Sequence, residues 1–386
     1  MVDTGIAIFA YNRSGHLKKV LDGLRKNEIS HNVYIFQDGM KNSENLNGHN
    51  AVKEIISAID WMEFDYVYSI ENKGCAKSIE DGISYVLGRH DAVIILEDDC
   101  VPLPYFFNYM DACLEKYKEN EKVIGIGGFA WNLDMNIDAI KEDVYASGRT
   151  SSWGWGTWKD RWKGYKRDYE ILRRLYFDQM ASERLGIWGD DFEDVLCAEL
   201  TCRVDAWDVF WALHTVEKDK VFILPYKSLV ENIGTDGTGT HCSKTDSFIP
   251  RYYWDGAKDF RLIDNCEPTL EIKMAFAPLW NGYGHYMEYK NADYKKAILW
   301  GIGNYYRRNK KNVLKEYDVQ AFIDKKKIRY FEGKPVIDCS LIHEYEYEYI
   351  VIMFSNKEEA VRMKQQLIII YKIPEHRIIV WQEEGV

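Results

Sequence analysis

Three consecutive acids stand where a strongly apolar segment of the sequence ends. The segment Val93–Leu96 has the composition of a buried strand, and Glu97, Asp98 and Asp99 follow it directly. Carboxylates at the rim of a buried sheet cost free energy unless cations or hydrogen-bond donors compensate them. Mg²⁺ and Mn²⁺ prefer carboxylate oxygens and often share them with substrate phosphates. The triplet therefore predicts a cation and phosphate site; the alternative is an ordinary strand end whose acids are solvated or cap the next helix.

Two lysines and a histidine lie at other places where a phosphate could bind. Lys73 and Lys77 flank Gly74 at the start of a predicted helix, and helix N-termini favour anions. Lys77 could equally be solvated. His241 closes a glycine- and threonine-rich loop, 234–240, and could coordinate a metal or touch a diphosphate when that loop closes. An ordinary surface histidine is the alternative interpretation.

The most unusual segment of the chain is rich in tryptophan and glycine. Trp153, Trp155 and Trp158 occur close together and are separated mainly by glycine. Their rings could stack on a sugar, and the glycines would let the backbone approach a ligand closely. Packing of the same rings in a loop-rich core explains the pattern equally well, so both interpretations stay open.

The elements that must position these residues alternate between strand and helix over the first 130 residues. Apolar runs bounded by polar residues predict strands, and amphipathic periodicity predicts helices between them. Such an alternation favours right-handed βαβ units and a parallel sheet, which binds ligands beyond the carboxyl ends of its strands. The predicted strands are 6–10, 33–37, 65–70, 93–96 and 123–128, and the predicted helices are 16–26, 50–61, 75–87 and 105–118.

The remainder of the chain divides into three parts. Residues 131–260 complete a first domain, 1–260, with a long amphipathic helix predicted over 192–216 and a strand over 221–224. Residues 261–310 are predicted to be a helical connector, with a helix at 295–306 and a basic linker at 307–311. Residues 311–386 are predicted to form a small α/β accessory module, in which 349–380 reads as one βαβ unit. No glycine-rich turn follows the first strand of that unit, so it lacks the feature that cradles phosphate.

Composition excludes several classes of protein. The 386 residues carry a formal net charge of −11, which argues against nucleic-acid binding. The 15% aromatic content favours flat surfaces of the kind that bind sugars and bases. Eight cysteines without a CxxC pair make zinc sites and a disulfide framework unlikely and fit a reducing compartment.

The chain shows no apolar stretch long enough for a membrane span and no signal peptide pattern. The expected location is therefore the cytoplasm. Small basic clusters, such as Lys325–Lys327, leave peripheral contact with the inner face of a membrane open, although a solvated face explains them more simply.

Five segments together carry a resemblance to a known family, and the resemblance covers about residues 5–242. They are Ile8–Ser14, Phe36–Gly39, Val93–Asp99, Pro104–Phe107 and the pair Trp207-Asp208. On these segments the chain resembles the GT-A nucleotide-sugar-dependent glycosyltransferases. It looks most like the N-acetylglucosaminyltransferase I family and bacterial family-2-like sugar transferases. The resemblance implies a Rossmann-like GT-A fold with a mostly parallel sheet, whose residues 1–130 bind the nucleotide sugar and whose residues 131–260 face the acceptor.

The resemblance also implies how the donor is held. Arg13 and Asp38 would contact the uracil or the diphosphate of the donor. Glu97 would contact the donor sugar, Asp98 the ribose, and Asp99 the metal. A metal that bridges the diphosphate oxygens would stabilise the negative charge that develops on the leaving group, and one carboxylate suffices as its protein anchor if phosphates complete the shell.

The same resemblance implies that Asp208 is the catalytic base. A reaction that inverts the anomeric centre needs one base, which takes the proton of the acceptor hydroxyl. Asp208 could instead be a helix-surface acid, and Asp205, on the same predicted helical face, is its rival. An acidic cluster just upstream more readily begins the helix, where carboxylates complement the dipole; it comprises Asp190, Asp191, Glu193 and Asp194.

These observations predict a metal-dependent inverting glycosyltransferase that uses Mn²⁺ or Mg²⁺. The donor would be a nucleoside-diphosphate sugar, with a UDP-sugar favoured, and the acceptor a hydroxyl of a cell-surface glycan or a lipid-linked oligosaccharide. A sugar nucleotidyltransferase would need a glycine- and lysine-rich triphosphate loop after the first strand, where this chain has Ala10–Gly15. A non-catalytic carbohydrate-binding protein would use the tryptophans without needing the three acids.

Overall fold

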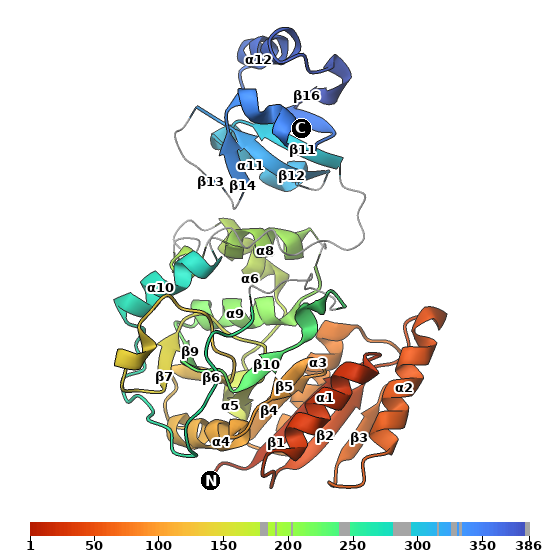
Figure 1. Cartoon of the computed structure of the whole chain (residues 1–386), viewed down its shortest axis with the longest axis vertical. Coiled ribbons are helices and arrows are strands. Elements are labelled where there is room, and N and C mark those ends of the chain that lie inside the picture. Colours follow the sequence, from red (N-terminus) through yellow and green to blue (C-terminus); the bar gives the residue numbers. More distant parts are fainter. Residues whose placement is uncertain are drawn as a thin grey trace. The chain divides into compact units, whose positions relative to one another are not determined.

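Two compact units make up the chain. The computed structural model describes residues 1–177, 184–189, 191–201, 204–238, 248–280, 295–314, 316–325, 330–331 and 334–382. The first unit comprises Met1–Gly189 and Val204–Leu279, and the second comprises Asp190–Arg203 and Trp280–Val386. Figure 1 shows the elements of each unit in the colours of the sequence.

An eight-stranded sheet organises the first unit, with strand order β3-β2-β1-β4-β8-β6-β9-β7. Strands β8 and β7 run antiparallel to their neighbours, and the other pairings are parallel. The predicted α/β class with a mostly parallel sheet is therefore confirmed. The strands are β1 (Thr4–Ala10), β2 (Asn32–Gln37), β3 (Asp65–Tyr68), β4 (Ala92–Glu97), β6 (Val123–Gly127), β7 (Val144–Ser147), β8 (Trp155–Trp158) and β9 (Val221–Pro225).

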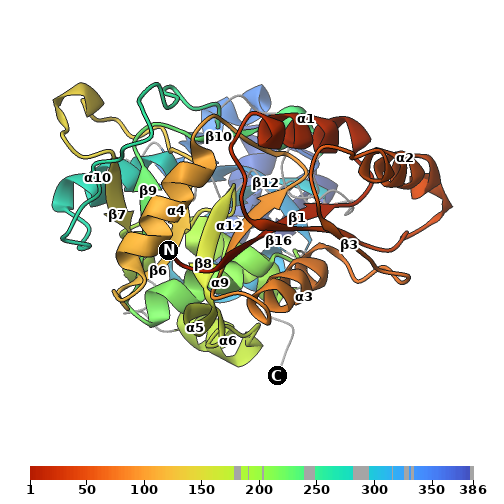
Figure 2. The same cartoon turned by 90° about the horizontal axis from the view of Figure 1, so that it is seen from below.

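Helices bury both faces of this sheet, because alternate residues of each strand point to opposite sides. On one face, Ile6 and Ile8 pack with apolar residues of α1 (Ser14–Arg25), α2 (Leu46–Ser57) and α4 (Phe106–Tyr117). On the other face lie α3 (Cys75–Leu87) and α9 (Trp207–Glu217), as Figure 2 shows. The remaining elements of the unit are β5 (Cys100–Pro102), β10 (Val230–Asn232), α5 (Lys159–Trp162), α6 (Tyr169–Phe177), α10 (Leu270–Trp280) and the 3₁₀ helices η1 (Ser43–Asn45), η2 (Ile137–Ala139) and η3 (Gly234–Asp236).

The single long helix predicted over 192–216 is wrong. The structure has α8 (Asp191–Leu200) and then α9, which begins at Trp207 after an extended Ala206 with φ −118° and ψ 112°. Apolar residues recur in both helices, although α8 also carries four acids, and this recurrence does not mark the break between them. As a result Asp208 lies in the first turn of α9, whereas Asp205 precedes the helix and does not share its face.

A six-stranded sheet organises the second unit, with strand order β13-β14-β12-β11-β15-β16. Its pairings are parallel apart from that of β13 with β14. Helix α11 (Asn304–Val313) packs on the face that carries Ala297 and Leu299, and α12 (Lys357–Ile369) on the face that carries Ile298. The strands are β11 (Lys295–Trp300), β12 (Tyr317–Ile323), β13 (Tyr330–Phe331), β14 (Lys334–Ile337), β15 (Tyr349–Ile352) and β16 (Ile378–Val380); η5 (Cys339–Glu344) and η6 (Glu375–Arg377) are its 3₁₀ helices.

Two sequence predictions about this region are wrong. Residues 295–300 form a strand rather than a helix, and the basic run 307–311 lies in α11 rather than in a linker. Since β11 lies within the range predicted as a helical connector, the second unit extends upstream of residue 311. The first strand of its sheet is therefore β11, and the glycine-containing turn Gly301–Gly303 does follow it. Gly301 has φ +113°, and an added Cβ would lie 2.8 Å from the carbonyl oxygen of Met353, so the close approach of two strand ends requires a glycine here.

Among the helices in the described residues, none combines the length and the apolar character needed to cross a bilayer.

Candidate functional site

The carboxyl ends of β1 and β4 bring Arg13 and the acidic triplet together. The two strands are parallel neighbours in which Phe9 pairs with Glu97, so the segments that follow them emerge at the same edge of the sheet. One guanidinium nitrogen of Arg13, Nη2, donates to Asp98 and, at 2.7 Å, to Oδ2 of Asp99. The other, Nη1, is buried and has no hydrogen-bond partner among the described residues.

The charges at this edge do not balance. Burial opposes the charge on Arg13, but Asp98 and Asp99 outweigh it and raise the pKa of the guanidinium. Burial, partly offset by Arg13 and reinforced by Asp99, raises the pKa of Asp98 to about 6. Burial and the neighbouring carboxylates of Asp99, Asp208 and Asp98 raise the pKa of Glu97 well above its usual value. Four carboxyl groups thus face one arginine.

The start of α9 places Asp208 beside this cluster. Trp207 is buried and stacks on Trp155 of β8, with ring centroids 5.2 Å apart and planes at 17°. Because β8 pairs directly with β4, this stack fixes the helix next to the strand that carries the acids. Asp208 follows at once, and Oγ of Ser152 lies 3.4 Å from its Oδ2. The structure therefore brings Arg13, Glu97, Asp98, Asp99 and Asp208 together; these are five of the residues predicted from sequence.

The carboxylate of Asp38 binds a neighbouring loop and does not belong to the acidic cluster. Its carboxylate is 6% exposed and accepts hydrogen bonds from the backbone N–H groups of Gly39, Lys73 and Gly74 and from Nδ2 of Asn72. Both oxygens are therefore engaged within the protein. Asp38 is positioned to shape the loop 71–74 that leads into α3, and any effect on a bound nucleotide would pass through that loop.

We expect Asp38→Ala to weaken binding of a nucleoside diphosphate and also to destabilise the protein. Truncation removes the acceptor of the part-buried N–H groups of Lys73 and Gly74, and an unsatisfied donor costs up to about 1–3 kcal/mol when it is fully buried. Calorimetric titration with UDP and a urea unfolding curve measure the two effects. Equal affinity in both proteins would remove Asp38 and its loop from nucleotide recognition.

Lys73 and Lys77 do not point into the cluster. Their ammonium groups both pair with Asp81 one to two turns into α3, the Lys73 contact being 3.0 Å. Both side chains are exposed, at 43% and 60%. The solvated alternative describes these side chains better, although the backbone N–H of Lys73 belongs to the loop that Asp38 holds.

The tryptophans divide between core and surface. Trp155 is 0% exposed and Trp158 is 3% exposed, so the prediction that Trp155 stacks on a ligand is wrong. Its ring contacts Trp162, Trp207 and Trp211 instead. Trp153 is half-buried and packs with Trp131 and Phe248, at centroid distances of 5.2 Å each. Trp153 therefore remains a candidate for ligand contact.

Sequence reasoning missed three neighbours of the acids. Nε2 of His16 lies 3.2 Å from Oδ2 of Asp236, and the charge of His16 also acts on Asp98. Cys75 is exposed at the start of α3. The carboxylates of Glu97, Asp98, Asp99 and Asp208 act electrostatically on its thiol. Gly234 packs so closely that an added Cβ would lie 2.2 Å from Oδ2 of Asp99. His16 could have been suspected because it stands one helical turn after Arg13; the other two give no sequence signal. His241 lies outside the described residues.

The residues present fit a divalent cation bound together with a phosphate. Within the described residues, no three His, Cys, Asp or Glu side chains are arranged to hold a metal by themselves. The surplus of carboxylates at the edge nevertheless favours a cation, and Mg²⁺ or Mn²⁺ commonly uses one or two carboxylates with phosphate oxygens completing its shell. The unpaired Nη1 of Arg13 is a donor suited to such a phosphate.

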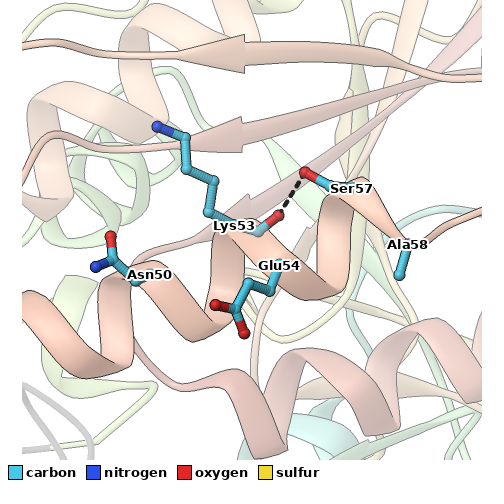
Figure 3. A pocket seen from close by; sticks show the side chains of 5 residues that line it. All are labelled: Asn50, Lys53, Glu54, Ser57 and Ala58. Carbon is cyan, nitrogen blue, oxygen red and sulfur yellow. Dashed lines mark hydrogen bonds between the residues drawn. The ribbon is translucent and has the colours of Figure 1, made fainter.

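A separate surface pocket lies on α2 and is shown in Figure 3. Lys53 turns its ammonium group over the ring of Tyr68 at 4.2 Å, and Oγ of Ser57 donates to the carbonyl oxygen of Lys53 at 2.8 Å. A single helix lines the pocket, and none of the strand-end acids reaches it, so it takes no part in the candidate site. Its lining residues are Asn50, Lys53, Glu54, Ser57 and Ala58.

Glu97→Gln should stabilise the metal-free protein increasingly as the pH rises. The pKa of Glu97 is raised in the folded state, so its protonated form contributes stability that is fully present below the usual pKa near 4.5. This contribution is lost as the pH rises through the raised pKa. Glutamine stays neutral, and each unit by which the pKa is raised corresponds to about 1.4 kcal/mol. Unfolding curves in EDTA at several pH values between 4 and 9 check this; a gain that is independent of pH would contradict it.

Comparison with known protein families found a match in one part of the chain. A family model described as C2185-like, N-terminal, matches residues 293–379, within the second unit. None of the curated proteins matches the chain.

Solved structures share a distant likeness with the chain. A mannosyltransferase from Pyrobaculum calidifontis, in complex with GDP-Man and Mn²⁺, is 11% identical with a TM-score of 0.34; the match covers 56% of this chain and 74% of that one. Glucosyl-3-phosphoglycerate synthase from Mycobacterium tuberculosis, in complex with Mn²⁺, UDP and glucosyl-3-phosphoglycerate, is 9% identical with a TM-score of 0.26. That match covers 41% of this chain and 57% of the synthase.

Proposed function

We propose that this protein is a metal-dependent glycosyltransferase that moves a sugar from a nucleoside-diphosphate donor, with a UDP-sugar favoured, to an acceptor hydroxyl. The observation that carries the proposal is the cluster at the ends of β1 and β4, where Arg13 pairs with Asp98 and Asp99 while Asp208 acts electrostatically on the adjacent Glu97. A group of carboxyl side chains, of which Asp98 is buried, beside an unpaired arginine donor suits a ligand that brings a cation and phosphates together.

The residues of the chain divide the work of such a transfer. Asp99 would hold a divalent cation, which would neutralise charge on the diphosphate leaving group. Nη1 of Arg13 would donate to a phosphate oxygen. The acceptor oxygen attacks the anomeric carbon of the donor sugar, the bond to the diphosphate breaks, and Asp208 takes the acceptor proton. A single base on the face opposite the leaving group corresponds to inversion of the anomeric centre.

The finer parts of the proposal concern the biological setting. An acceptor on a cell-surface glycan or a lipid-linked oligosaccharide, a role in polysaccharide biosynthesis and a cytoplasmic location follow from the sequence resemblance and composition. A carbohydrate-binding protein without catalysis is less well supported, because Trp155 and Trp158 are buried and are not available to stack on a sugar.

A thermal-shift panel tests the proposal directly. The protein is melted with UDP, GDP, CDP and dTDP and with UDP-glucose, UDP-N-acetylglucosamine and GDP-mannose, each with and without Mn²⁺. A matching ligand at about 100 times its dissociation constant should stabilise the fold by about 2.7 kcal/mol, and only with the metal. Stabilisation by a nucleoside diphosphate that needs no metal would contradict the metal-dependent mechanism, and no response to any nucleotide would contradict the function.

A further inference from the structure

Helix α9 begins without the usual means of fixing its first turn. Its N-cap residue is Ala206, whose side chain makes no capping hydrogen bond, although capping by Ser, Thr, Asp or Asn is common at this position. Among the described residues, the side chain of Asp208 has the long 3.4 Å contact from Ser152 and a local bond from the N–H of Val209. The direction in which Asp208 points must therefore depend on how other groups hold the start of the helix.

A three-residue network contacts the start of α9 from outside. Oε1 of Glu80, on α3, accepts a hydrogen bond from the hydroxyl of Tyr165 at 2.7 Å. The same hydroxyl lies 3.1 Å from the carbonyl oxygen of Trp207, the residue before Asp208. Nε of Arg167 lies 3.7 Å from Oε1 of Glu80. Glu80, Tyr165 and Arg167 are called the α9 latch below.

Arg167 adds two further contacts on either side of Trp207. Its Nη2 pairs with the carboxylate of Asp205, just before the helix, and its guanidinium lies 5.2 Å from the ring centroid of Phe210, in the first turn. The latch therefore contacts residues 205, 207 and 210, which together determine both the position and the rotation of that turn.

The latch is itself held firmly in place. The ring of Tyr165 stacks on Trp162 with centroids 4.4 Å apart and planes at 19°. The side chains of Glu80 and Arg167 are only 16% and 20% exposed, whereas Asp205 is 64% exposed. Helices α3 and α9 pack together, so Glu80 ties the start of α9 to the helix that begins with Cys75 beside the acidic cluster.

We propose that the α9 latch consists of positioning residues that hold the first turn of α9 and thereby set the position of Asp208 next to the acidic cluster. The catalytic part of this statement rests on the proposed function, in which Asp208 is the base, whereas the structural part does not. None of the three latch residues touches the cluster directly; they act through the backbone of α9.

Tyr165→Phe tests the latch because it removes the hydroxyl and keeps the ring stack. We expect amide hydrogens of the peptide 204–212 to exchange about 5- to 10-fold faster, measured by hydrogen exchange and mass spectrometry, with little change in global stability. Glu80→Gln keeps an acceptor for Tyr165 and should show a smaller change than Glu80→Ala. The matched control is Glu217→Gln, which removes the ion pair with Arg174 in the last turn of α9 and should leave the exchange of 204–212 unchanged.

The catalytic part is tested by release of nucleoside diphosphate from UDP-glucose, UDP-N-acetylglucosamine and GDP-mannose in Mn²⁺. Tyr165→Phe should lower kcat by about 10- to 100-fold and leave KM for the donor nearly unchanged, since a small misplacement of a catalytic group can cost about 100-fold. In an Asp208→Asn background the same substitution should lower kcat less than about 2-fold further, because its effect passes through Asp208.

Unchanged exchange of 204–212 in Tyr165→Phe would overturn the latch. Full additivity with Asp208→Asn would overturn its action through Asp208. If the native protein released no nucleoside diphosphate from any donor, the proposed function would fail instead, and the exchange experiment alone would then decide whether the latch positions the helix.

Discussion

Replacing Asp208 by Asn should lower the rate of the proposed sugar transfer by at least about 100-fold, while the affinity for the donor nucleotide should stay nearly unchanged. Asparagine keeps the shape of the side chain and can still accept the contact from Ser152, but it cannot take the proton of the acceptor hydroxyl. General-base catalysis contributes about 10²–10⁴-fold. The measurement is kcat for transfer, together with calorimetric titration of the nucleoside diphosphate.

The control for this prediction is Asp205→Asn, three residues earlier. Asp205 is mostly exposed and pairs with Arg167, and an amide oxygen can still accept from that guanidinium. Its expected effect is therefore mild. If Asp205→Asn were the inactive variant and Asp208→Asn the active one, the base would be misassigned. Full activity of both variants would place inversion itself in question, and the anomeric configuration of the product, read by NMR, would then decide the mechanism.

Asp99→Asn should remove most metal-dependent turnover, by about 100-fold or more, because stabilisation of the leaving group by a divalent cation supplies several kcal/mol. The fold should survive, since the amide oxygen can still accept from Nη2 of Arg13, the partner of Asp99 at 2.7 Å. We also expect the Mn²⁺ concentration for half-maximal activity to rise by at least about 10-fold, because a neutral amide is a weaker ligand for a hard cation.

The matched control is Asp81→Asn, an acid of α3 that pairs with Lys73 and Lys77 away from the cluster. Its metal dependence should equal that of the native protein. An Asp99→Asn variant with unchanged Mn²⁺-dependent turnover would exclude Asp99 as a metal ligand.

Strands β1, β2 and β4 of the first sheet were predictable because each is a nearly continuous apolar run. Both faces of β1, β2 and β4 are covered by helices, and such strands need apolar residues at every position. Strand β8 was not predictable from Trp155–Trp158, because alternation of tryptophan with small residues fits a binding surface as well as a core. Its place between β4 and β6 depends on pairings between distant segments, which a local pattern does not contain.

Strand β11 was missed for a related reason. Lys295–Trp300 is short, begins with two lysines and ends in four apolar residues, and such a run fits a helix or a strand equally well. Only its position between β12 and β15 makes it the central strand of the second sheet. Because β11 was not predicted as a strand, the glycine-containing turn that follows it, Gly301–Gly303, was not predicted either.

The charged members of the candidate site could be predicted, but the hydrogen bonds that arrange them could not. Arg13 and the triplet stand directly after parallel strands, where a sequence pattern and a topology rule point to the same edge. The sequence predicts that Asp38 contacts a ligand, because no sequence pattern indicates the four donors that bond to its carboxylate. Three of these donors are backbone N–H groups. The α9 latch joins Glu80 of α3 to Tyr165 and Arg167, which lie between α5 and α6, and it too becomes visible only in three dimensions.

The division of the second unit into Asp190–Arg203 and Trp280–Val386 has a consequence for synthesis of the chain. Helix α8 leaves the ribosome before the whole of Val204–Leu279, which belongs to the other unit. At about 5–20 residues per second this delay is roughly 4–15 s. During that time apolar side chains such as Leu196 and Cys197, which are buried in the finished protein, have no completed unit to join. Chaperones therefore have a defined interval in which to bind the nascent chain. Because each unit contains two segments of the chain, one cleavage of the backbone cannot separate the two units.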